Sequence, residues 1–226
     1  MDDNGLIRTP SGVTFRVIRL QFSKTGRAKF ISHLDLNRTM TRALRRAGLP
    51  IWYTEGFNKH PYLTFASPLS LGYEGLAEYM DIRLVEDVPM EEVLARLNAT
   101  MPEGLCFTNA AEAVKKPADL ASAAWRITVG CSAEDVRAFL EQPSITVEKR
   151  TKKKTMKTVE LKPLLGAVQA EGADDGTVLT LTLPCSNTET VNPSLMLTAF
   201  ETFLSRPLKT AVLRLCLLDT EGKIYR

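Results

Sequence analysis

Residues 22–73 read FSKTGRAKFISHLDLNRTMTRALRRAGLPIWYTEGFNKHPYLTFASPLSLGY, and this stretch decides how the first half of the chain is predicted to fold. Ser32 is a favourable N-cap, and Asp35 three residues later is a carboxylate version of the capping box. Gly48 and Pro50 form a stop signal, because glycine accepts the left-handed conformation and proline cannot continue a helix. We therefore predict a helix of about four turns between these signals.

The predicted helix, over residues 33–47, has an aliphatic face and a basic face, because each residue is turned by about 100° from the one before it. The aliphatic face consists of Leu36, Met40, Ala43, Leu44 and Ala47. The basic face consists of Arg38, Arg42, Arg45 and Arg46. We expect the basic face to be exposed and to suit phosphate, since guanidinium groups make bidentate contacts with it. A solvated face without a ligand would give the same pattern.

Beyond this helix, a short strand over 51–54 leads into a long loop predicted for 56–75. Loops longer than about 12–15 residues are uncommon in compact domains and are usually functional or disordered. Because this loop is rich in aromatic residues, we predict that it is ordered. Aromatic rings beside Lys59 and His60 suit the stacking of unpaired bases, although a small core under the loop would use the same rings.

Three stretches together are similar to a known family: SKTGRAKFISHLDL (23–36), RALRRAGLP (42–50) and EGFNKHPYLTFASPLSLGYEGLAEYMDI (55–82). They resemble a radical-SAM-linked family of bacterial proteins of unknown function. Its domains occur fused to, or encoded next to, a radical SAM enzyme, often near ribosome and RNA-processing genes. The resemblance therefore implies a radical SAM partner. The family favours proline where this chain has Lys59 and serine near Gly75, and neither departure removes a histidine or an arginine.

The order of predicted elements in the first half is β-α-β-β-α-β, as in a ferredoxin-like domain. Its strands are predicted at 15–22, 51–54, 76–84 and 105–112, and its helices at 33–47 and from Pro89 onward. The second half repeats this order. Its strands are predicted at 125–130, 145–150, 177–183 and 211–218, and its helices at 133–141 and 194–204.

We therefore predict an α+β protein of two tandem ferredoxin-like domains with antiparallel sheets, over residues 15–114 and 125–226. A flexible tail over 1–14, a linker over 115–124 and a basic hairpin insert over 149–162 complete this organisation.

Composition excludes several classes of protein. The 226 residues are 44% hydrophobic, enough for two cores, but no apolar run is long enough to span a membrane. The first residues lack the apolar core of a signal peptide, so a cytoplasmic location is expected. The four cysteines are scattered without a CxxC pair. A three-cysteine iron–sulfur cluster is thus not predicted, the chain is not itself a radical SAM enzyme, and we expect no metal and no cofactor.

The net charge of +3 conceals an uneven distribution. Residues 22–62 hold eight lysines and arginines against two acids, and residues 146–162 hold seven against two. Segregated positive charge favours polyanionic partners such as RNA.

His33 and His60 are the candidate catalytic residues, because histidine titrates near neutral pH. Packing at a helix start and hydrogen bonding within a loop are the alternative roles of these two side chains. The candidate RNA-binding residues are Lys24, Arg27, Arg38, Arg42, Arg45, Arg46, Asn58, Lys59, Tyr62, Lys152, Lys153 and Lys154.

Three functions fit these patterns. The first is an RNA-binding accessory domain that works with a radical SAM enzyme, in tRNA or rRNA modification. The second is a metal-independent ribonuclease of the kind that processes CRISPR repeat RNA, an analogy at the level of fold. The third is a protein adaptor that does not bind RNA. We favour the first and do not expect this chain to catalyse a reaction on its own.

Overall fold

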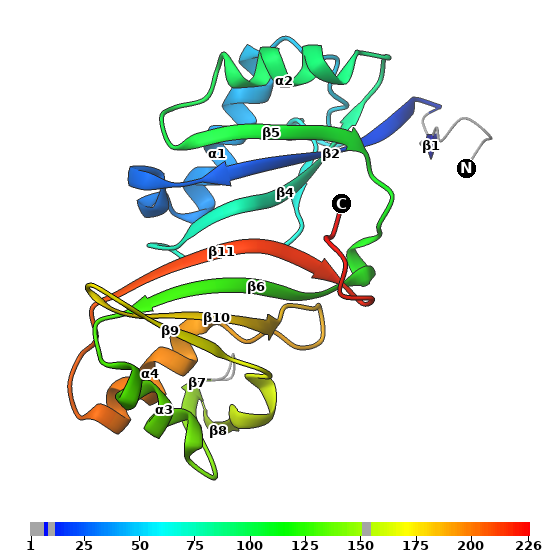
Figure 1. Cartoon of the computed structure of the whole chain (residues 1–226). Coiled ribbons are helices and arrows are strands. Elements are labelled where there is room, and N and C mark those ends of the chain that lie inside the picture. The colour runs from blue at the N-terminus through cyan, green and yellow to red at the C-terminus, as the bar shows by residue number, and fades with distance from the viewer. Residues whose placement is uncertain (1–6, 9–11, 151–154) are drawn as a thin grey trace. The chain divides into compact units, whose positions relative to one another are not determined.

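The computed structural model describes residues 7–8, 12–150 and 155–226. These residues form a mixed α+β structure with four α-helices and antiparallel strand pairs (Figure 1). The chain divides into two compact units, Met1–Pro117 with Arg226, and Ala118–Tyr225.

The first unit contains a four-stranded antiparallel sheet in the order β5–β2–β4–β3, with a short additional strand on β2. Its elements are β1 (Ile7–Arg8), β2 (Thr14–Lys24), η1 (Gly26–Phe30), α1 (His33–Arg46), β3 (Leu63–Phe65), β4 (Glu74–Leu84), α2 (Met90–Asn98) and β5 (Leu105–Glu112). In Figure 1, α1 and α2 lie together on one side of β5, β2 and β4.

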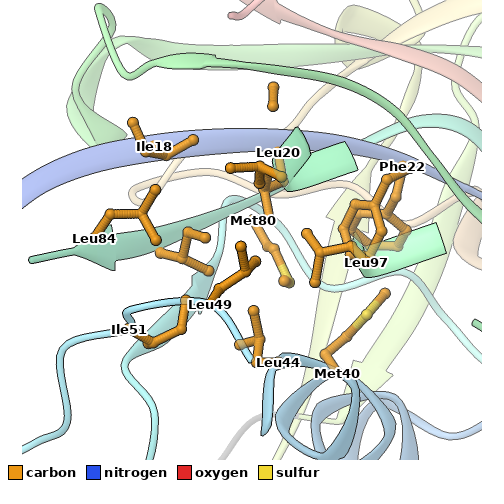
Figure 2. Packing of buried hydrophobic residues seen from close by; sticks show 14 of the residues in the cluster. Ile18, Leu20, Phe22, Met40, Leu44, Leu49, Ile51, Met80, Leu84 and Leu97 are labelled. Carbon is orange, nitrogen blue, oxygen red and sulfur yellow. The ribbon is translucent and has the colours of Figure 1, made fainter. Parts of the chain in front are cut away.

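The core of this unit lies between the sheet and the two helices. Strand alternation places Ile18, Leu20 and Phe22 of β2 on the covered face, and these side chains are buried. Figure 2 shows Phe22 beside Leu97 of α2, and all three belong to one buried cluster with Met40 of α1. The aliphatic face predicted for α1 is thus the face that packs on the sheet.

Both ends of α1 form as the local sequence predicts. The Oγ of Ser32 accepts a hydrogen bond from the backbone N–H of Asp35 at 3.1 Å. The chain leaves the helix through Gly48, whose φ of +60° lies in the left-handed region that glycine adopts without strain.

The opposite face of the same sheet carries the buried Arg19 beside the half-buried Asp81. Arg19 and Asp81 form a bidentate ion pair, with Nε–Oδ1 and Nη2–Oδ2 distances of 2.8 Å. Phe15 and Tyr79 on this face are also buried.

The second unit contains an antiparallel sheet in the order β11–β6–β10–β9 and a separate β7–β8 hairpin. Its elements are η2 (Pro117–Asp119, which begins at the last residue of the first unit), β6 (Leu120–Val129), α3 (Ala133–Glu141), β7 (Thr146–Arg150), β8 (Met156–Glu160), η3 (Lys162–Leu164), β9 (Gln169–Ala173), β10 (Gly176–Pro184), α4 (Pro193–Leu204) and β11 (Thr210–Asp219). Phe139 of α3 stacks on Phe200 of α4, with ring centroids 4.4 Å apart.

Several predicted elements differ from the structure. The strand predicted at 145–150 pairs with β8 and is not part of the four-stranded sheet; the edge position is taken by β9. Strand β9 was not predicted because all five of its residues are exposed and give no apolar alternation. The Asp-Gly pair at 175–176 after β9 is the hairpin signal that would have revealed it.

Smaller differences occur elsewhere. The strand predicted at 51–54 is wrong: this segment makes only isolated bridges, and β3, inside the predicted 56–75 loop, is the strand that pairs with β4. Strand β6 begins inside the predicted 115–124 linker. Most of the predicted 1–14 tail lies outside the described residues, but Ile7–Arg8 pair with Phe15 and Thr14 as strand β1.

Candidate nucleic-acid interface

The arginine face of α1 is exposed, as its periodicity predicts, but its four members differ in their contacts. Arg38 forms an ion pair with Asp35 at 3.1 Å, and Arg46 donates to the backbone oxygen of Thr100 at 2.9 Å. Arg42 and Arg45 make no hydrogen bond or ion pair with any residue that the structure describes. These two guanidinium groups are therefore the ones on α1 whose full hydrogen-bonding capacity is available to a ligand.

The Ser32 cap also affects the charge at the start of α1. The Ser32 Oγ–H donates to Oδ2 of Asp35 at 2.8 Å. This hydrogen bond is the largest cause of the lowered pKa of the Asp35 carboxyl, and the hydrogen bond from Arg38 is the next largest. Asp35 is paired directly with Arg38, and it also acts on Arg42 through its charge, whereas Arg45 is not among the groups that shift its pKa.

Lys24 corrects one sequence-based prediction, because its side chain is only 1% exposed and cannot reach an RNA phosphate. It occupies the last position of β2, on the same face as Phe22, and its Nζ donates to the backbone oxygen of Lys29 at 3.3 Å. Extending the alternation of β2 by two residues would have predicted this burial. Arg27, by contrast, is exposed in η1 and makes no ion pair with described residues.

His33 is the first residue of α1 and is exposed. Its ring meets the ring of Phe65 edge to face, with centroids 5.1 Å apart. Phe65 belongs to β3, so this contact ties the start of α1 to the edge of the sheet.

His60 closes a loop over residues 54–60. The backbone N–H of Thr54 donates to the His60 oxygen at 2.9 Å, and the backbone N–H of His60 donates to Oγ1 of Thr54 at 3.2 Å. The ring Nδ1 lies 2.9 Å from the Asn58 backbone oxygen and 3.1 Å from Oγ1 of Thr54. Loop hydrogen bonding, one of the two roles considered from the sequence, is thus present at His60.

The structure does not bring the two imidazoles into contact. Residues 63–65 form β3, and the five residues that follow His60 can span up to about 16 Å. His33 lies at the Phe65 end of this run, and His60 lies at the other end. No hydrogen bond or ring contact among the described residues joins them.

Tyr62 contributes to a cluster of rings around Arg83. The Arg83 guanidinium carbon lies 3.8 Å from the ring centroid of Tyr62, 4.3 Å from that of Phe15 and 4.8 Å from that of Trp52. Stacking on Arg83 engages one face of the half-buried Tyr62 ring, so its role as an RNA contact stays a prediction. Alternation along β4 places Arg83 on the outward side, but the rings come from three separate segments, so the sequence does not reveal the cluster.

Phe57, Asn58 and Lys59 are exposed at the tip of the 54–60 loop. The Phe57 side chain is fully exposed, at 108% of its reference area. The side chains of Asn58 and Lys59 make no hydrogen bond with any described residue.

Lys152, Lys153 and Lys154 lie outside the described residues. The adjoining strands β7 and β8 pair from Thr146–Glu160 to Arg150–Met156. Within the described part of the chain, no group of three or more His, Cys, Asp or Glu side chains is arranged to hold a metal ion. None of the helices among the described residues is both long and apolar enough to cross a membrane.

The fold and this surface define an α+β protein with a basic helix face and an exposed aromatic loop. The family described as an uncharacterized protein conserved in bacteria (DUF2344) matches residues 17–193, more than half of the chain. The chain therefore belongs to this family.

No curated protein matches the chain. A solved structure described as an unknown protein from Galdieria sulphuraria is similar over 88% of this chain and 98% of its own length. The two are 12% identical and superpose with a TM-score of 0.27, which supports no argument about fold or function.

Proposed function

We propose that this protein is an RNA-binding accessory protein that works with a radical SAM enzyme in tRNA or rRNA modification. The observation that carries the proposal is the pair of exposed guanidinium groups, Arg42 and Arg45, one turn apart on α1 and without a described ion-pair partner. Spacing of three residues places them as neighbours on the helix surface, where they can contact adjacent phosphates.

The location of this interface follows from burial. An antiparallel sheet with helices on one face can bind RNA through its other face, by stacking bases on exposed aromatic residues. Here Arg19 on that face pairs with Asp81, and the rings of Phe15, Trp52 and Tyr62 surround Arg83, so these side chains are already engaged within the first unit. Phosphate contacts are therefore assigned to α1, with Arg27 as a further cation.

A protein partner also has a candidate docking surface on the first unit. Phe30, Leu34 and Leu71 are each more than half exposed. The backbone N–H of Gly72 donates to the backbone oxygen of Lys29 at 2.8 Å. This hydrogen bond holds the backbone next to Leu71 close to the backbone next to Phe30. Contiguous exposed apolar residues are typical of protein interaction sites, and we assign this one to the radical SAM partner that the family resemblance implies.

We extend the proposal to the fold and the location. In each four-stranded sheet, the last strand in sequence pairs with the first, and the third strand lies between the first and the second. This is the strand order of a ferredoxin-like domain. We therefore assign two such domains in tandem. A cytoplasmic location is consistent with four cysteines that form no disulfide.

The test is the salt dependence of RNA binding, measured by fluorescence anisotropy with labelled total tRNA. Each lost phosphate contact lowers the slope of log affinity against log salt by about 0.7–0.9. Arg42→Ala with Arg45→Ala should therefore weaken binding and lower the slope by roughly 1.4–1.8. The matched control removes two exposed arginines of the second unit, Arg126 and Arg137, and should change the slope far less. No binding to RNA at low salt would exclude the proposal.

The ribonuclease alternative is less well supported. Metal-free cleavage needs a base and an acid at one phosphodiester bond, but His33 contacts Phe65 and the His60 ring contacts Asn58, and no contact among the described residues joins the two histidines. Metal-independent cleavage that is lost in both His33→Ala and His60→Ala would favour it nonetheless.

The adaptor alternative predicts a different result. Binding to the radical SAM protein would then be insensitive to RNA, and Leu34→Glu would abolish it while the Arg42/Arg45 double variant remained normal.

A further inference from the structure

The 54–60 loop has a fixed shape that presents one aromatic ring to solvent. Two hydrogen bonds between Thr54 and His60 close its ends, and a third interaction, from the His60 ring to the Asn58 oxygen, holds its second half. Gly56 has φ +113°, a conformation that residues with a side chain rarely adopt, and it precedes Phe57. The position of Phe57 is therefore determined by the loop and not by packing of the ring itself.

Phe57 differs from the other aromatic residues nearby. Trp52 and Tyr62 are partly buried and stack around Arg83, whereas Phe57 contacts no ring among the described residues. Its neighbours Gly56 and Asn58 add no apolar surface. The apolar area offered by the loop tip is thus that of a single ring, which matches a nucleobase better than an apolar protein pocket.

The groups beside Phe57 match the remaining parts of a nucleotide. The Asn58 amide carries both donors and an acceptor, as the edges of bases require. The Lys59 ammonium is exposed and makes no described ion pair, so it can contact a phosphate.

The His60 ring supplies an acceptor. A backbone carbonyl only accepts hydrogen bonds, so the Nδ1 that lies 2.9 Å from the Asn58 oxygen carries the proton. The neutral ring then has its lone pair on Nε2. A ribose 2′-hydroxyl can donate to such an acceptor, and that group is what distinguishes RNA from DNA.

We propose that the 54–60 loop binds one unpaired ribonucleotide: its base stacks on Phe57, Asn58 contacts the base edge, Lys59 the phosphate, and Nε2 of His60 the 2′-hydroxyl. This site rests on the RNA-binding function proposed above. It adds a preference for unpaired RNA, which phosphate contacts from α1 do not provide.

The experiment uses the full chain and a 10-nucleotide RNA with one 2-aminopurine, alone or annealed to its complement. Stacking on Phe57 should quench the 2-aminopurine fluorescence of the single strand and not of the duplex. Phe57→Ala should abolish this quenching and weaken single-strand binding by about 5- to 150-fold, the range measured for loss of one stacked base. Phe57→Tyr should retain both. Because the ring is fully exposed, circular dichroism of both variants should be unchanged.

The outcomes separate this proposal from the general one. If Arg42→Ala/Arg45→Ala weakens binding but Phe57→Ala changes neither affinity nor quenching, RNA binding stands and the nucleotide site is overturned. If the wild-type chain binds neither the single-stranded RNA nor the duplex, both proposals are overturned. If Phe57→Ala impairs binding only of the radical SAM protein, the loop is a protein-docking element and the nucleotide site is again overturned. Equal affinity for the 2′-deoxy oligomer would overturn the contact assigned to His60.

Discussion

The imidazole Nδ1 of His60 lies 2.9 Å from the backbone oxygen of Asn58, two residues earlier in the chain. The contact favours the Nδ1–H tautomer of the ring, since the carbonyl can only accept. It also makes His60 both part of the structure of the loop and an exposed acceptor. The first prediction follows from this pair of atoms.

Neutral His60 should be the Nδ1–H tautomer. Long-range ¹H–¹⁵N correlation spectra recorded on the neutral ring should show a protonated Nδ1 and an unprotonated Nε2. His33, whose described contact is with the Phe65 ring and not with a carbonyl, is the internal reference. An Nε2–H tautomer at His60 would contradict the assignment.

Loss of the Ser32 hydroxyl should raise the pKa of Asp35. Ser32→Ala removes the largest cause of the lowered pKa, and Arg38→Ala removes the next, so the rise should be larger in the first variant. Because the folded-state pKa is lowered, the ionised carboxylate stabilises the fold above the unfolded-state pKa. This contribution is lost as the pH falls through the folded-state value. Titration of the Asp35 carboxyl carbon by NMR measures both shifts, and an unchanged pKa in Ser32→Ala would refute the explanation.

The aliphatic face of α1 should contribute strongly to stability. Leu44 is buried in the core of the first unit, so Leu44→Ala should lower the free energy of unfolding by about 2–5 kcal/mol. Leu34, on the same helix but 59% exposed, is the matched control, and Leu34→Ala should change it by less than about 0.5 kcal/mol. Urea denaturation checks both values; similar costs for the two would mean that α1 packs through a different face.

Two glycines with positive φ should differ in their tolerance of alanine. At Gly48 (φ +60°) a Cβ would meet no atom within 4 Å, so the cost is the backbone strain of about 1–2 kcal/mol. At Gly104 (φ +84°) a Cβ would lie 2.5 Å from the backbone oxygen of Thr25, which adds a clash. The backbone N–H of Thr25 donates to the Gly104 oxygen at 2.8 Å, so these segments cannot separate without losing a hydrogen bond.

Thermal and urea unfolding should therefore rank Gly104→Ala below Gly48→Ala in stability. Equal stability of the two variants would show that the backbone near residues 25 and 104 can move to accommodate the added Cβ without lowering the free energy of unfolding.

The amino-acid sequence by itself determined the features that depend on neighbours along the chain. The Ser32 cap, the Gly48 exit and the two faces of α1 follow from helix periodicity and from local hydrogen bonding. The bounds of α3 and β5 were likewise predicted, since capping and alternation are local properties. Strand β9 was missed because an exposed edge strand carries no apolar pattern.

Tertiary structure alone decided which candidate residues are available to a ligand. Burial of Lys24, the ring cluster that occupies Tyr62, and the engagement of Arg46 by Thr100 each depend on segments distant in sequence. Charge and aromatic content are the same whether such a side chain faces solvent or stacks on another. Contacts between distant segments therefore distinguish Phe57 from Tyr62, which stacks on Arg83, and Arg42 from Arg46, which is bound by Thr100.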